Sequence, residues 1–220
     1  MAAQIEHFDI TCAPEFDGQA AVIGRRAENA YQRVASSLQH DLSFRPLLVL
    51  FETRAEQMRA LETRTVPGNR EHVIVALDIP GAGSEDNLVH ELSHLFLFDV
   101  LSPALHGNVP VWILEGLAEH QRGHWEAADM AVLRNMVETG TTPTLSDLDT
   151  GRVDSRRSAV FGHAAFDFLA SRAGTDGAQR FFAALRANPG TTLRNAYLAA
   201  LGVLDADFDR AFGEYLKSRL

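Results

Sequence analysis

The sequence predicts an α+β fold, with a mixed α/β first half and an all-helical second half. Short apolar, β-rich runs occur before residue 80, where they alternate with segments of helical periodicity. Beyond Val111 the apolar residues recur at helical spacing, and no convincing long strand is found. With 220 residues, 46% of them hydrophobic, the chain can bury a core. We expect a single domain, residues 1–220, with an α/β lobe at about 1–102 and a helical lobe at about 103–220.

In the first half, strands and helices are expected in alternation. The strands are expected at residues 8–12, 47–51 and 72–79, and the helices at 20–39, 54–62 and from a Ser84 cap to about Leu101. Thr53 precedes the second helix and Glu56 follows three residues later, which is a capping-box pattern. Residues 67–69, Pro-Gly-Asn, indicate a turn. Val22, Ile23 and Ala27 begin the apolar face expected for the first helix.

The second half is expected to consist of helices joined by short loops. Residues 102–110 are expected to form a loop, and the division between the lobes is placed at 103–110. The helices are expected near residues 112–123, 126–138, 157–173, 175–187, 191–200 and 205–219.

Composition and charge exclude several function classes. A net charge of −9 argues against non-specific binding to nucleic acid or anionic membrane. No apolar run approaches the length of a membrane span. Cys12 is the single cysteine, so no intrachain disulfide can form, which fits a reducing compartment. Residues 1–4 lack the features of a signal peptide, and localisation stays open between the cytoplasm and export after removal of a signal.

The most informative stretch is His90-Glu91-Leu92-Ser93-His94, which reads H-E-x-x-H. Histidines four residues apart share one face of a helix and can bind one metal ion. Glu91 lies between them, where it can hold the attacking water. The alternative is an ordinary helix with two histidines, which leaves unexplained why they are embedded in an apolar segment.

A catalytic zinc site uses three protein ligands and one open position. The segment 112–119 reads W-I-L-E-G-L-A-E, and its Glu115, separated from His94 by twenty residues, is the best third ligand. Glu119 follows one helical turn later and is expected to accept a hydrogen bond from a zinc-binding histidine. The alternatives are a helix-start carboxylate for Glu115 and a solvated side chain for Glu119.

These two motifs in this spacing resemble the gluzincin metallopeptidases, and most closely the small bacterial peptidase-MA-like proteins. The resemblance covers most of the chain, because the strand and helix at 47–62 and the C-terminal helices are also similar. It implies one Zn²⁺ ion held by His90, His94 and Glu115, with Glu91 as general base. It also implies a zincin-like fold, with a mixed sheet over the H-E-x-x-H helix and a helical lobe below.

The resemblance further implies an edge strand that pairs with an extended peptide substrate. The strand at 72–79 is our candidate. Its substrate-binding positions are Val73, Ile74, Val75 and Ala76.

In one respect the sequence departs from the family pattern. Similar proteins often carry an oxyanion-stabilising tyrosine where this chain has Phe161. His163 is the nearest substitute as an oxyanion donor, and its alternative is a packing or capping role. His120 and His124, also four apart, suggest a second metal site or, as the simpler reading, surface residues.

The sequence therefore predicts a zinc metallopeptidase acting on peptide or protein substrates. One alternative is a catalytically silent zincin-like domain with a binding or structural role, alone or in a multidomain protein. Another is a zinc hydrolase that cleaves a non-peptide amide. The intact Glu91 favours an enzyme, because a structural metal site has no use for a general base.

Overall fold

The computed structural model describes residues 5–13, 17–63, 73–78, 85–101 and 103–220. Within these ranges the chain is mostly helical with a small sheet, which confirms the α+β class. It divides into two compact units, residues 1–36 with 40–92, and residues 37–39 with 93–220. The division falls inside helix α3 (Glu85–Val100) and not in the loop expected at 103–110. The turn expected at 67–69, the Ser84 cap, and residues 72 and 79 of the third strand lie outside the described residues.

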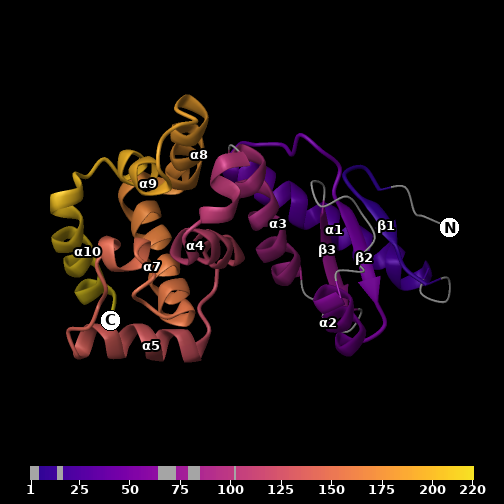
Figure 1. Ribbon diagram of the computed structural model, residues 1–220, viewed down its shortest axis with the longest axis horizontal. Helices are drawn as coiled ribbons and strands as arrows, with labels where there is room; N and C mark the ends of the chain where they lie inside the picture. Colours follow the sequence, from indigo (N-terminus) through magenta and orange to yellow (C-terminus); the bar gives the residue numbers. More distant parts are fainter. Residues whose placement is uncertain (1–4, 14–16, 64–72, 79–84, 102) are drawn as a thin grey trace. The chain divides into compact units, whose positions relative to one another are not determined.

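The first unit contains a sheet of three described strands, β1 (Asp9–Thr11), β2 (Leu47–Phe51) and β3 (Val73–Asp78). The strand order is β1-β2-β3, and both pairings are parallel (Figure 1). The prediction of a mixed sheet is wrong for these strands. Each connection contains a helix, and a helical crossover returns the chain in the same direction. The strand expected to bind substrate, β3, lies at an edge among the described strands.

Helices α1 (Asp17–Leu38) and α2 (Arg54–Thr63) form these crossovers. The buried face of α1 follows the predicted spacing, except that Val22 is 40% exposed. The capping-box prediction is confirmed in its first half, because the Glu56 backbone N–H donates to Thr53 Oγ1 at 3.2 Å. The central strand β2 buries Leu48 to Leu50 on both faces, as expected for a strand with neighbours on each side.

Among its described residues, the second unit contains helices joined by turns and loops, and no strand. After the C-terminal part of α3 come η3 (Pro103–Asn108), α4 (Val111–Arg122), α5 (Ala127–Glu138), α6 (Leu145–Asp149), α7 (Ser155–Ala173), η4 (Gly174–Asp176), α8 (Gly177–Ala187), α9 (Leu193–Leu201) and α10 (Asp205–Arg219). All six helices expected in this half are confirmed, with ends shifted by a few residues. Short 3₁₀ turns are common connectors, and η3 occupies part of the segment expected as a loop.

Helix α6 was not predicted, because five residues are too few to show helical periodicity. A local signal for it exists in Thr144 and Asp147. The Asp147 backbone N–H donates to Thr144 Oγ1 at 3.2 Å, and the Thr144 N–H donates to Asp147 Oδ2 at 3.1 Å. This is a capping box, and its T-x-x-D pattern could have indicated the helix start.

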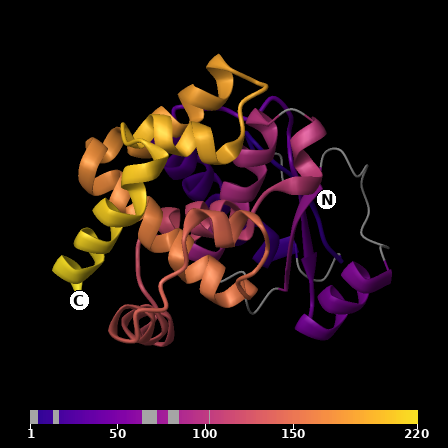
Figure 2. The same cartoon turned by 60° about the vertical axis from the view of Figure 1, so that its left-hand side comes forward.

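Helix α7 is the centre of the second unit and contacts α4, α5, α8, α9 and α10 (Figure 1). Figure 2 shows the same helices after a turn of 60°, with α5 viewed almost along its axis. The core around α7 is rich in aromatic rings from different helices. Its largest buried members are Trp112, Phe161, Phe166, Phe181, Phe182, Tyr197, Phe208 and Phe212. None of the helices in the described ranges has the length and apolarity needed to cross a membrane.

Helices α4 and α7 approach each other closely at two glycines. Gly116 and Gly162 are both buried, and a methyl group on either would clash with backbone atoms of the other helix. At Gly162 the clash would be with the carbonyl of Trp112. Glycine is therefore required at both positions so that the two backbones can approach. This approach sets the position of α4.

We expect Gly162→Ala to lower the free energy of unfolding by about 1–3 kcal/mol, because the backbone of α4 has to move away. Gly213→Ala in α10 is the matched control, since a Cβ there meets nothing within 4 Å. The control should gain about 0.5–1 kcal/mol from helix propensity. Urea unfolding followed by circular dichroism measures both. Equal stability of the two variants would contradict the close contact.

Candidate functional site

Helix α3 presents two histidines of the H-E-x-x-H motif on neighbouring turns. Glu85 and Asp86 occupy its first turn, where negative charge is favourable. Leu88, Leu92 and Phe96 are fully buried and hold one face of the helix in the core. His90 and His94 lie beside this face and are half-buried, so that their rings remain accessible. The helix that the sequence predicted around the motif is confirmed.

Helix α4 contributes the third residue, Glu115. Trp112, Ile113 and Leu117 are fully buried on the core side of α4. The Trp112 indole N–H also donates to Asp149 Oδ1 at 3.2 Å, which ties α4 to α6. Glu115 lies outside this buried face, with its side chain 33% exposed. Its Oε1 atom is 3.7 Å from His94 Nε2.

His90, His94 and Glu115 each offer one ligand atom, and these atoms all lie within 4.8 Å of one another. Around a tetrahedral zinc ion with bonds of about 2.1 Å, ligand atoms are about 3.4 Å apart. The pair His94–Glu115 is already near this spacing. Shortening the longer distances among the three ligand atoms to about 3.4 Å requires side-chain shifts of about 1 Å. Two imidazoles and one carboxylate are also the donor types that zinc takes in catalytic sites, so these residues fit a zinc ion.

The predicted general base, Glu91, follows His90 in the same helix and has an exposed side chain. Solvent therefore reaches this part of the helix surface. General acid–base catalysis requires a carboxylate within hydrogen-bond reach of the reacting water, and that position of Glu91 stays a prediction.

Glu119 makes a contact with Arg122 that the sequence did not predict. Arg122 Nη1 donates to both of its carboxylate oxygens, at 3.1 Å and 3.0 Å. This pair is largely shielded from solvent, with the two side chains 17% and 18% exposed. The arginine thus fixes the carboxylate along α4. A bond from Glu119 to a zinc-binding histidine stays a prediction.

A second polar cluster, centred on Asp167 of α7, was missed by the sequence reasoning. His120 Nδ1 lies 2.8 Å from Asp167 Oδ1, and the Trp125 indole N–H donates to Asp167 Oδ2 at 2.9 Å. Because an ionised carboxylate can only accept, the His120 Nδ1–H is the donor in this contact. His120 is half-buried rather than a plain surface residue. A signal for this cluster was an acidic residue between Phe166 and Phe168 in an apolar helix.

Burial and hydrogen bonding act on this cluster in opposite directions. Burial raises the pKa of the Asp167 carboxyl, but hydrogen bonds from His120 and Trp125 outweigh it and hold this pKa below its ordinary value. Burial lowers the pKa of His163 to about 4, although the nearby Asp167 carboxylate opposes this. Asp167 is therefore charged and His163 neutral at pH 7.

His163, predicted as an oxyanion donor, belongs to the Asp167 cluster. Its ring stacks on Trp125 with centroids 3.8 Å apart and an interplanar angle of 3°. Its Nε2 is 3.9 Å from Asp167 Oδ1, and it is not among the residues grouped with His94 and Glu115. These contacts support a packing role for His163, which was the alternative to the oxyanion role. The oxyanion role stays a prediction without a described contact behind it.

The low pKa of His163 makes stability depend on pH. The folded protein keeps this ring neutral down to about pH 4, whereas the unfolded chain protonates near pH 6.5. Because the unfolded state binds more protons between these values, the free energy of unfolding should fall as the pH drops through this window. The loss should reach about 3 kcal/mol at its lower end.

His163→Phe keeps a ring on Trp125 and should remove most of this pH dependence in urea unfolding measured from pH 7 to pH 4. His124→Gln is the control, since His124 is 45% exposed. If the free energy of unfolding of His163→Phe fell with pH as steeply as that of the parent protein, the buried neutral histidine would not be the source of the pH dependence.

Comparison of the chain with models of protein families, with curated proteins and with solved structures finds no match. The functional interpretation therefore rests on the residues of this chain and on the geometry that they adopt.

Proposed function

We propose that this protein is a zinc-dependent metallopeptidase of gluzincin type with a zincin-like fold. The observation that carries the proposal is the convergence of His90, His94 and Glu115, whose ligand atoms lie within 4.8 Å of one another. Two of these residues come from the H-E-x-x-H helix α3, and the third comes from α4. Two imidazoles four residues apart on one helix and a carboxylate from the next helix support one zinc site.

Each residue has a defined role in this proposal. A zinc ion bound by the three ligands would polarise the scissile carbonyl and activate water for attack. Glu91 would accept a proton from the attacking water and transfer it to the leaving amine. Its place in the H-E-x-x-H motif, between the two histidines, supports this role. Arg122 holds Glu119 beside this region of α4, which limits the motion of that carboxylate.

A peptide is the substrate class that we propose. Strand β3 lies at an edge of the described sheet, and an edge strand can hydrogen-bond to an extended peptide. Backbone groups of Val73, Ile74, Val75 and Ala76 would supply these bonds. Recognition through backbone atoms accepts many side chains, so we expect broad sequence tolerance.

The metal site is tested by zinc content. The parent protein, stripped with a chelator and reloaded, should contain one zinc ion per chain by mass spectrometry. His94→Ala should lower zinc affinity by at least about a hundredfold, since even residues that only support ligands change it by 10–100-fold. His124→Ala, which removes a histidine outside the three-residue group, should bind zinc like the parent. Equal zinc affinity of the two variants would contradict the site.

The catalytic role is tested by peptide turnover. The zinc-loaded parent should cleave members of a diverse peptide library, and Glu91→Gln should keep its zinc but lose at least about a hundredfold in rate. Glu138→Gln, an exposed carboxylate of α5, is the matched control and should retain full rate. Full turnover by Glu91→Gln would contradict the role of Glu91 as general base. Zinc binding without turnover in the parent would instead favour a silent binding domain.

A further inference from the structure

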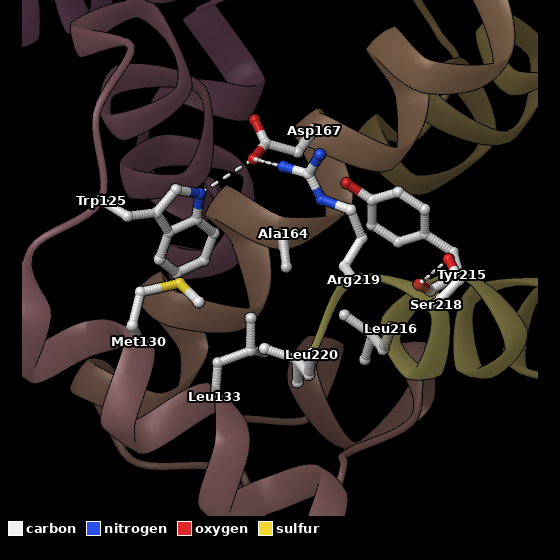
Figure 3. Close-up of a pocket in the computed structure, with 10 residues that line it drawn as sticks. All are labelled: Trp125, Met130, Leu133, Ala164, Asp167, Tyr215, Leu216, Ser218, Arg219 and Leu220. Atoms are coloured by element: carbon white, nitrogen blue, oxygen red, sulfur yellow. Dashed lines mark hydrogen bonds and ion pairs between the residues drawn. The ribbon is translucent and has the colours of Figure 1, made fainter.

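The Asp167 cluster lies at the edge of a hollow in the second unit. Two pockets of about 440 Å³ and 430 Å³ share four lining residues, Trp125, Asp167, Tyr215 and Arg219. Figure 3 shows the first of these pockets. We call the space that these four residues line the Asp167 hollow. Each pocket is within the size range of small-molecule sites. The residues come from α7, α10 and the segment between α4 and α5.

One side of the Asp167 hollow is apolar. Met130, Leu133, Ala164, Leu216 and Leu220 line it below the polar groups in Figure 3. The Trp125 ring stands at the border between the apolar and polar sides. Such a surface favours a ligand with an apolar or aromatic body and a polar group at one end.

The polar side of the hollow does not suit a cation. Asp167 accepts hydrogen bonds from His120 and Trp125, and Arg219 Nη2 lies 4.0 Å from its Oδ2. The Arg219 guanidinium also lies over the Tyr215 ring, 5.9 Å from the centroid. The positive charge of Arg219 would repel a ligand amine that approached the Asp167 carboxylate.

Hydrogen-bond donors in the hollow exceed the acceptors that the protein supplies. Arg219 makes no hydrogen bond to any residue within the described ranges, and its side chain is 60% exposed. His163 also lacks a hydrogen bond within those ranges, although its side chain is only 5% exposed and lines the hollow. A ligand with acceptor oxygens would supply partners to both.

The other carboxylates that act on His163 are already neutralised. Glu119 is paired with Arg122, and Asp129 lies 3.1 Å from Arg156. Arg219 is paired with Asp167 at 4.0 Å, and this carboxylate also accepts hydrogen bonds from His120 and Trp125.

We propose that the Asp167 hollow binds a small carboxylate with an apolar or aromatic body. Arg219 and His163 donate hydrogen bonds to its carboxylate, and the apolar side with Trp125 holds its body. The ligand is either a free carboxylic acid or the C-terminal carboxylate of an apolar peptide, which share this chemistry. The site does not depend on the proposed peptidase activity.

Titration calorimetry with 3-phenylpropionate tests the site. The acid should bind, and its amide and the amine 3-phenylpropylamine should bind at least about tenfold more weakly, as expected for loss of one charge-assisted hydrogen bond. Arg219→Gln should weaken binding of the acid by about tenfold. Arg172→Gln, which removes an exposed arginine of α7 outside the hollow, should leave binding unchanged. The His163 ring signals should shift in NMR spectra when the acid is added.

Equal binding of the acid and the amine, no binding of the acid, or an unaffected Arg219→Gln variant would each overturn the proposal. A second titration with N-acetyl-alanyl-phenylalanine and its C-terminal amide identifies the source of the carboxylate. Tighter binding of this peptide acid than of 3-phenylpropionate would support the proposal with a peptide C-terminus as the ligand. Tighter binding of 3-phenylpropionate would support it with a free acid.

Discussion

The close approach of α4 and α7 at Gly116 and Gly162 is the constraint on which both polar sites depend. Two helix backbones meet where a single methyl group would not fit. Trp112 strengthens this arrangement, because its ring contacts Phe161 and Tyr197 edge-to-face and its N–H is bound by Asp149. With α4 held in this way, Glu115 comes next to the glycine contact and its carboxylate meets His94. The polar geometry is thus a consequence of apolar and backbone packing.

Helix α4 supplies residues to both polar clusters. Glu115 joins the candidate metal centre, whereas His120 bonds to Asp167 of α7. They are five positions apart, which corresponds to a rotation of about 140° around the helix axis. The two residues therefore point in different directions from one helix, and the two sites are chemically separate although they share a support.

The two clusters differ in their balance of hydrogen-bond donors and acceptors. In the candidate metal centre, two imidazole nitrogens and a carboxylate offer lone pairs to a common point, which suits a cation. Around Asp167, three N–H groups surround one carboxylate, and Arg219 and His163 retain donors toward the hollow. This excess of donors suits an anion. The same residue types, histidine and acid, thus present opposite hydrogen-bonding character at the two clusters because their neighbours differ.

The sequence by itself determined the longer helices, the three described strands and the helix that carries the H-E-x-x-H motif. These depend on local periodicity, capping and spacing, which neighbouring residues encode. It also indicated Glu115, because a second motif lies at a suitable distance along the chain. Only the tertiary structure decided that the described strands are parallel, that Arg122 binds Glu119, and that His163 stacks on Trp125 beside Asp167. The Asp167 hollow combines side chains from three separate segments, and a single sequence does not show which helix faces meet. That choice is made when buried surfaces, such as those at Gly116 and Gly162, fit together.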